Sequence, residues 1–104
     1  MLGHRFVERV VDDPLGLRDR AILETMYSAG LRVSEAVGVN EEDLDYDQGL
    51  VRVRGKGKRE RLSPLGSFAV KAVQQWIRAR KLSPKEPQNG TAPVFLNKFG
   101  RRLT

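Results

Sequence analysis

The spacing of apolar residues predicts two main helices. Between Leu17 and Ala29, apolar side chains recur on one face and charged side chains on the other, which is typical of an amphipathic helix. Gly30 follows at a position where helices commonly end, because glycine adopts the left-handed conformation without steric cost. A second helix is predicted from Ser67, as its N-cap, to about Arg80. Its buried stripe should consist of Ala69, Val70, Val73, Trp76 and Ile77.

Shorter elements are predicted between these helices. Ser34 is expected to be the N-cap of a short helix. Asn40 should begin a further turn, in which the acidic residues 41–43 suit the N-terminus of a helix. Residues 44–46 predict a short strand, and residues 47–49 predict a turn.

Residues 49–62 predict two more strands, joined by a tight basic turn at residues 55–58. In the first of them, Val51 and Val53 alternate with Leu50 and two arginines, so the two valines should share one face. With the short strand at 44–46, the expected fold is α+β, with helices packed around a small three-stranded antiparallel sheet.

The basic residues of this predicted hairpin face one another. A four-residue turn places Arg54 opposite Arg59 and Arg52 opposite Arg61. Like charges directly across an antiparallel pair are destabilising, and an anion lying along that face would turn the repulsion into attraction. The plainer interpretation is a solvated hairpin whose long basic side chains splay into water.

The distribution of charge along the chain favours the interpretation in which the hairpin binds an anion. The chain has 104 residues, enough for one domain or part of one, and a formal net charge of +6. Residues 49–62 carry six Lys or Arg and one Glu, whereas the other 90 residues carry 13 basic and 12 acidic groups. An excess confined to one hairpin is typical of a surface that binds a polyanion.

Composition argues against several other kinds of site. The sequence contains no cysteine, which excludes disulfides and thiolate metal sites, and its one histidine, His4, argues against a zinc site. No apolar run approaches the roughly 20 residues needed to cross a bilayer, and residues 1–8 do not have the pattern of a signal peptide. We therefore expect a cytoplasmic protein with no metal site and no membrane partner.

Two ligand-binding motifs fail on spacing. Five residues separate Gly49 from Gly55 where a phosphate-binding loop has four, and Gly57 replaces the Ser or Thr that would hold magnesium. The acidic residues within 41–47 lack the central glycine and terminal glutamate of a calcium loop. They are better interpreted as a solvated turn with helix-capping charges.

Two cations are candidates for chemistry, and each has a plainer interpretation. Arg32 lies at the corner between two predicted helices. In the plainer interpretation it pairs with Glu35 or with unpaired carbonyls at the end of a helix; in the functional one its guanidinium binds a phosphate through two hydrogen bonds. Lys56 stands between two glycines and is either a solvated turn lysine or a probe held at the tip of the hairpin. These residues alone leave both alternatives open.

Several segments together resemble the tyrosine recombinases (phage integrase family), in particular the bacterial Xer-type enzymes. The resemblance is carried by residues 16–24, 27–35, 43–45, 49–65, 94–96 and 100–104. These segments span roughly residues 15–104 and occur in the family's order, with 24 residues from Arg32 to Lys56.

The resemblance implies roles for individual residues. The arginine that matches Arg32 binds the non-bridging oxygens of the scissile phosphate and stabilises the charge that builds as a tyrosine attacks. The lysine that matches Lys56 enters the minor groove and protonates the departing 5′ oxygen. Glu35 matches the family's structural acid, which orients the arginine. The other hairpin cations become contacts to the DNA backbone: Arg52, Arg54, Lys58, Arg59 and Arg61.

The resemblance places residues 1–104 in the N-terminal half of the family's catalytic domain. In the family, a His-x-x-Arg pair and the nucleophilic tyrosine lie downstream, and a core-binding domain lies upstream. We therefore expect a truncated piece that binds double-stranded DNA as a monomer and does not cleave it. Its intact parent would break and rejoin DNA through a 3′-phosphotyrosyl intermediate, as a homo- or hetero-tetramer without metal or cofactor.

The alternative function is a non-catalytic remnant that binds DNA or a protein partner in an accessory or regulatory role. The reading frame beyond Thr104 distinguishes the two, because a downstream His-x-x-Arg and late tyrosine favour the recombinase. An RNA-binding module has less support, since aromatic residues for base stacking are scarce near the hairpin.

Overall fold

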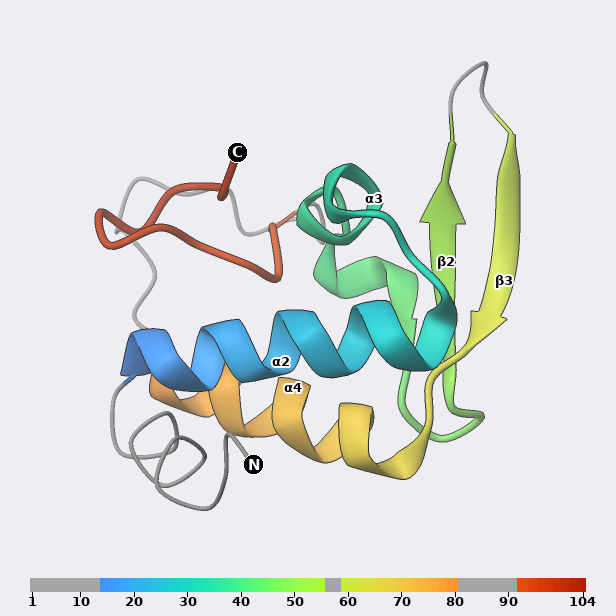
Figure 1. Ribbon diagram of the computed structural model, residues 1–104, viewed down its shortest axis with the longest axis horizontal. Helices are drawn as coiled ribbons and strands as arrows, with labels where there is room; N and C mark the ends of the chain where they lie inside the picture. Colours follow the sequence, from blue (N-terminus) through green and yellow to red (C-terminus); the bar gives the residue numbers. More distant parts are fainter. Residues whose placement is uncertain (1–13, 56–58, 81–91) are drawn as a thin grey trace, which may run out of the picture.

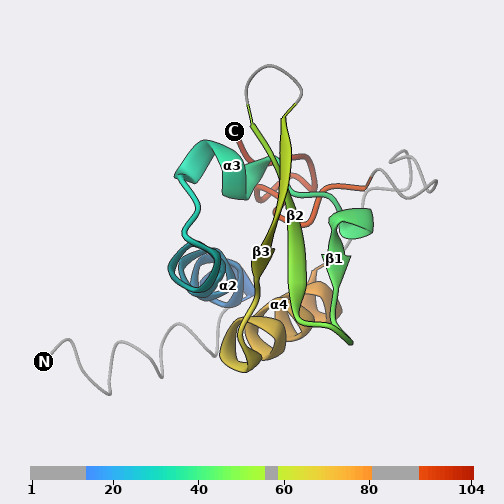
Figure 2. The same ribbon diagram turned by 90° about the vertical axis from the view of Figure 1, so that its right-hand side faces the viewer.

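The computed structural model describes residues 14–55, 59–80 and 92–104. Helix α2 (Pro14–Ala29) and helix α4 (Ser67–Ala79) lie side by side and run in opposite directions (Figure 1). A small antiparallel sheet stands across the end of this helix pair where α2 finishes and α4 begins (Figure 2). No helix within these described ranges is long and apolar enough to cross a membrane.

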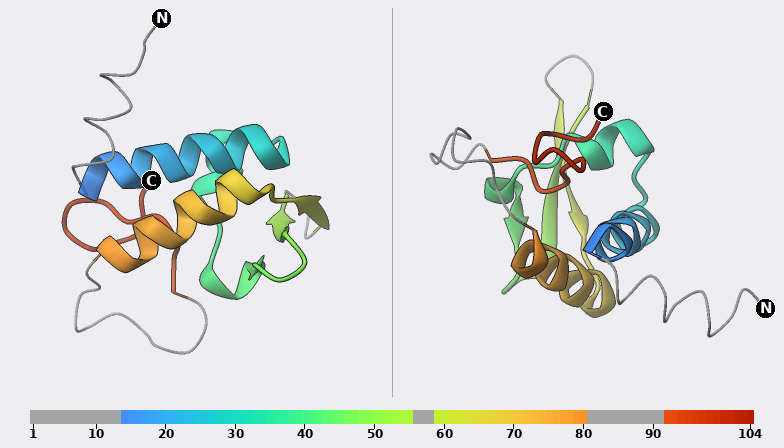
Figure 3. Two further views of the ribbon diagram at one scale, coloured as in Figure 1. Left: turned by 90° about the horizontal axis from the view of Figure 1, so that it is seen from below. Right: turned by 90° about the vertical axis from the view of Figure 1, so that its left-hand side faces the viewer.

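Helices α2 and α4 lie against each other, as the view from below in Figure 3 shows. Most of the side chains that they bury are small, which allows this close approach. The buried residues are Ala21, Thr25 and Ala29 in α2, and Ala69, Ala72, Val73 and Trp76 in α4. The predicted stripe of α4 is therefore only partly confirmed, because Val70 and Ile77 are half-buried and Ala72 joins the core. Gly66 precedes the first turn of α4, so the prediction that Ser67 is its N-cap was wrong by one residue.

The sheet contains strands β1 (Leu44–Asp45), β2 (Leu50–Arg54) and β3 (Glu60–Pro64), in the order β1-β2-β3 with both pairs antiparallel. Val51 and Val53 are fully buried and face the helices, as their alternation predicts. The expected α+β fold with a three-stranded antiparallel sheet is confirmed.

The register of the β2–β3 hairpin differs from the predicted one. Arg54 lies opposite Glu60, and Arg52 lies opposite Leu62, so the predicted Arg54–Arg59 and Arg52–Arg61 pairs were wrong. The register differs because the loop is longer than predicted. Gly55 N donates a hydrogen bond to the carbonyl of Arg59 at 2.8 Å, and the last ladder pair is Arg54 with Glu60. The loop beyond the last ladder pair therefore has five residues instead of four, and one residue of slip moves a strand's side chains to opposite faces.

Two short elements join α2 to the sheet: helix α3 (Val33–Val37) and the 3-10 helix η1 (Glu41–Asp43). α3 lies beside the upper part of β2 in Figure 2. Residues 92–103 then return behind the sheet and supply Val94, Phe95 and Leu96 to the core, each at most 1% exposed. This return is held by main-chain bonds, including Val94 N to the carbonyl of Val39 at 3.0 Å.

Candidate nucleic-acid interface

Arg32 lies at the corner between α2 and α3. Gly30 ends α2 with a φ of 68°, and buried Leu31 turns the chain so that Arg32 becomes the N-cap of α3. The prediction that Ser34 is this N-cap was wrong, because the side chain that caps the helix is an acid within its first turn. The Arg32 guanidinium is exposed and forms no hydrogen bond or ion pair with any residue that the structure describes.

Glu35 supplies that cap and also reaches the hairpin. Its Oε1 accepts a hydrogen bond from Arg32 N at 2.9 Å, and its Oε2 accepts one from Arg61 Nη1 at 3.0 Å. The side chain is 17% exposed, and the bonds from Arg61 and then from the Arg32 amide hold the pKa of the carboxyl below its usual value. Glu35 thus pairs with the main chain of Arg32, which leaves the guanidinium available for an anion.

The outer face of the hairpin carries arginines that are already paired with carboxylates. Arg54 Nη2 lies 2.9 Å from Asp43 Oδ1 and 3.1 Å from Glu42 Oε1, and the Asp43 bond raises the pKa of Arg54. Arg52 Nε lies 3.6 Å from Glu60 Oε2. Sequence reasoning missed these pairs, although the acidic residues at 41–43 and Glu60 were the signal for them.

Arg59 differs from the other hairpin arginines in the described part of the chain. Its side chain is exposed and has no ion pair or hydrogen bond there, whereas Arg52, Arg54 and Arg61 each have a carboxylate partner. Lys56 and Lys58 lie outside the described residues. The structure therefore brings Arg32, Glu35 and Arg61 together, and it does not test the position of Lys56.

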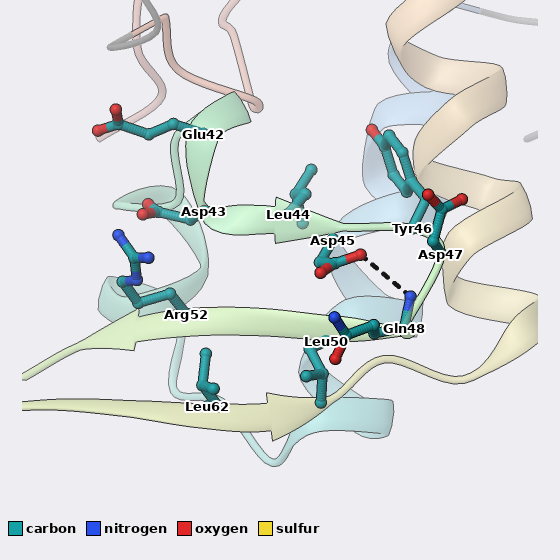
Figure 4. Close-up of a pocket in the computed structure, with 10 residues that line it drawn as sticks. All are labelled: Glu42, Asp43, Leu44, Asp45, Tyr46, Asp47, Gln48, Leu50, Arg52 and Leu62. Carbon is teal, nitrogen blue, oxygen red and sulfur yellow. Dashed lines mark hydrogen bonds between the residues drawn. The ribbon is translucent and has the colours of Figure 1, made fainter.

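A pocket of about 520 Å³ lies over β1 and β2, on the face of the sheet that carries Leu50 and Arg52 (Figure 4). Its ten lining residues are Glu42, Asp43, Leu44, Asp45, Tyr46, Asp47, Gln48, Leu50, Arg52 and Leu62. Four carboxylates against one guanidinium would repel a phosphate, so this pocket does not suit a nucleic-acid backbone. Within the described ranges, no group of three or more His, Asp or Glu side chains could hold a metal ion.

Arg80, at the end of α4, forms a second charged cluster with a structural role. Its side chain is 3% exposed and contacts Glu41 Oε1 at 2.7 Å and the carbonyl of Val94 at 2.7 Å. Burial lowers the pKa of Arg80 and raises the pKa of nearby Tyr46. Trp76 Nε1 donates to the same Val94 carbonyl at 2.7 Å, so this cluster fixes residues 93–94 against α4.

Similarity in sequence and in fold to known proteins indicates one family. A sequence model of the Phage integrase family matches residues 4–104. The chain is 49% identical over 96 residues to tyrosine recombinase XerC of Syntrophus aciditrophicus, covering 89% of this chain and 31% of that protein. It is 43% identical over 96 residues to tyrosine recombinase XerD of Bifidobacterium longum, covering 88% of this chain and 31% of the relative.

Solved structures agree with the sequences. The XerH site-specific recombinase bound to its palindromic difH substrate, a post-cleavage complex, matches with a TM-score of 0.72 and 25% identity, over 95% of this chain and 29% of that one. The Tn1549 transposon integrase with circular intermediate DNA matches in fold, with a TM-score of 0.73 and 23% identity, over 96% of this chain and 38% of that one. The chain spans about 30% of the length of its curated relatives. It belongs to the phage integrase family, the family of the tyrosine recombinases.

Proposed function

We propose that this chain forms the N-terminal part of a recombinase catalytic domain and binds the backbone of double-stranded DNA. The observation that carries the proposal is the position of Arg32. Its guanidinium is exposed and unpaired among the described residues, at the start of a helix that Glu35 ties to the hairpin. Relatives of the same fold are described in complex with DNA, which supports the same partner for this chain.

Arg32 would bind the scissile phosphate. A guanidinium donates two parallel hydrogen bonds to the non-bridging oxygens and neutralises the charge that builds during attack by a tyrosine. Lys56 would protonate the departing 5′ oxygen as general acid. Both roles come from the resemblance to the family, and Lys56 lies outside the described residues.

The DNA-binding residues would contribute unequally. Arg59 meets a phosphate without losing any partner among the described residues, whereas Arg52, Arg54 and Arg61 would have to exchange a carboxylate for the phosphate. An exchange of one anionic partner for another gains little free energy. We therefore assign the main backbone contacts to Arg32 and Arg59, together with Lys56 and Lys58, and lesser ones to the paired arginines.

The matched segment would bind DNA, and strand cleavage would need the family's nucleophilic tyrosine. In the family the nucleophilic tyrosine lies downstream of the matched segment, and the parent enzyme would act as a tetramer on DNA. The activity of such a parent would be site-specific breakage and rejoining of DNA through a 3′-phosphotyrosyl intermediate.

DNA binding is tested by fluorescence anisotropy with a labelled duplex at several salt concentrations. If four side chains contact phosphates, the logarithm of the association constant should fall with the logarithm of salt with a slope of about −3.6. The Arg32→Ala chain, checked for folding by circular dichroism, should bind more weakly and with a shallower slope. No binding at low ionic strength, or binding indifferent to salt, would sink the proposal.

The catalytic roles need a chain that also carries the downstream segment. In that chain, Arg32→Ala should abolish covalent attachment to DNA. The Lys56→Ala chain should recover cleavage on a substrate whose 5′ oxygen is replaced by sulfur, because a thiolate leaves without a general acid. Normal cleavage by Arg32→Ala would contradict its assignment to the scissile phosphate.

A further inference from the structure

We infer that Arg61 is a positioning residue, which holds Arg32 in place through Glu35 and so couples the hairpin to the phosphate-binding arginine. The inference rests on the proposed function for the role of Arg32. It gives Arg61 a task different from that of a DNA backbone contact.

The three residues form one continuous chain of hydrogen bonds. Arg61 Nη1 donates to Glu35 Oε2 at 3.0 Å, and Glu35 Oε1 accepts from Arg32 N at 2.9 Å. Both oxygens of one carboxylate are therefore engaged, one by strand β3 and the other by the residue that begins α3. Hydrogen bonds to an ionised group are about twice as strong as neutral ones, so this link is stronger than an ordinary helix cap.

The strand register explains why Arg61 points this way. Arg61 lies opposite Val53, which is fully buried, so its side chain leaves β3 on the face that α3 covers. Arg52 and Arg54 leave the hairpin on the other face and reach Glu60, Glu42 and Asp43. Of these three arginines of β2 and β3, Arg61 is the one linked to Arg32 through hydrogen bonds.

Helix α3 needs this external support. It has five residues, and so short a helix is not stable without tertiary contacts. The backbone at Arg32 is extended, with φ −81° and ψ 161°. The bond from its amide to Glu35 holds this backbone against α3, and the turn at Gly30 sets its direction at the end of α2. If Arg61 is removed, Glu35 gains freedom and the orientation of the Arg32 side chain becomes less defined.

A direct contact between Arg61 and DNA is the competing explanation. In that case a phosphate would displace Glu35, and the carboxylate would face the incoming DNA with one oxygen unpartnered. The other charged side chains near Glu35 are Asp43, Arg52 and Arg54, which share with it the lining of a small pocket of about 30 Å³.

The two explanations differ in a double-mutant cycle on duplex affinity. Arg32→Ala should weaken binding about tenfold, from the loss of charge-assisted bonds. Arg61→Gln should weaken binding through the same residue, so the double variant Arg32→Ala, Arg61→Gln should bind within about twofold of Arg32→Ala alone. Losses that multiply would overturn the inference. In the matched cycle, Arg59→Gln should combine with Arg32→Ala multiplicatively, because the Arg59 side chain is exposed and has no bond to Glu35 or to any other described residue.

A second measurement requires no DNA. The amide proton of Arg32 reports on Glu35, so its NMR shift should titrate with a midpoint below the ordinary value of 4.5. In Arg61→Gln the midpoint should rise toward that value, and in Arg61→Lys it should rise less; an unchanged midpoint would overturn the inference. A chain that binds no duplex contradicts the proposed function, and this titration then decides whether Arg61 is coupled to the main chain of Arg32 through Glu35.

Discussion

Arg54 Nη2 lies 2.9 Å from Asp43 Oδ1, and the Asp43 side chain is only 1% exposed. The other oxygen of Asp43 accepts a hydrogen bond from Asn40 N at 2.9 Å. The Arg54 guanidinium thus links the hairpin to η1 through a nearly buried carboxylate, and this bond stabilises the fold. A carboxylate partner of this kind distinguishes the arginines that stabilise the domain from those that remain available to DNA.

Removing the Arg54 side chain should therefore destabilise the domain. Arg54→Ala leaves the nearly buried carboxylate of Asp43 with one unpaired oxygen, so we expect a measurable loss in the free energy of unfolding. Denaturant unfolding followed by the fluorescence of Trp76, the only tryptophan, measures it. Arg59→Ala is the matched control and should change stability by less than about 0.5 kcal/mol; equal losses in both variants would refute the distinction.

Arg80 should matter more than its neighbour Arg78. Arg80→Met keeps the aliphatic stem but leaves the carbonyl of Pro93 and the carboxylate of Glu41 without their donor. The carbonyl of Val94 keeps only its bond from Trp76 Nε1. The expected cost is about 2–3 kcal/mol in unfolding free energy. Exposed Arg78→Ala on the same helix should cost less than about 0.5 kcal/mol. Similar stability of the two variants would mean that the Arg80 cluster contributes no net stability.

Two glycines with positive φ should respond differently to alanine. At Gly30, φ is 68° and no atom lies within 4 Å of an added Cβ, so Gly30→Ala should cost only the left-handed strain, about 1–2 kcal/mol. At Gly49, φ is 65° and a Cβ would lie 3.0 Å from the carbonyl of Leu65, so Gly49→Ala should cost more. Thermal or denaturant unfolding of both variants decides the order, and a larger loss at Gly30 would contradict it.

Glu35 should make stability depend on pH in a defined direction. Its pKa in the folded chain lies below the ordinary value of 4.5, so its contribution is complete above that pH and is lost as pH falls through the lowered value. The difference in unfolding free energy between the natural chain and Glu35→Gln should therefore shrink on acidification below about pH 4.5. A difference that stays constant from neutral pH to about pH 3 would show that the carboxylate is not engaged as described.

Local signals in the sequence predicted the main elements well. The end of α2 at Gly30 and the alternation of Val51 and Val53 correspond to what the structure contains. The helix itself is confirmed, but it begins at Pro14, three residues before the predicted Leu17, and it buries Thr25 as well as Ala21 and Ala29. These features depend on neighbours within a few residues. The N-caps at Ser34 and Ser67 were wrong because hydroxyl residues also occur within the first turn, and the acid at Glu35 makes the cap of α3.

Features that join distant segments could not be predicted in the same way. The hairpin register depends on whether the Gly- and Lys-rich turn closes with four or five residues, and both lengths are compatible with its composition. The Arg80–Glu41 pair spans 39 residues and the Arg61–Glu35 pair spans 26, so no local pattern indicates them. At the candidate site, Arg32 and Glu35 are found adjacent, and the roles of Lys56 and the other cations stay predictions.

The hairpin arginines fall into those paired with carboxylates and those open to phosphate, and the salt dependence of duplex binding tests this division most directly. Association constants for the natural chain, Arg59→Ala and Arg54→Gln should be measured on one duplex across the same salt series. We predict that Arg59→Ala reduces the slope by about 1, whereas Arg54→Gln changes it by much less. A reduced slope in Arg54→Gln together with an unchanged slope in Arg59→Ala would contradict the account.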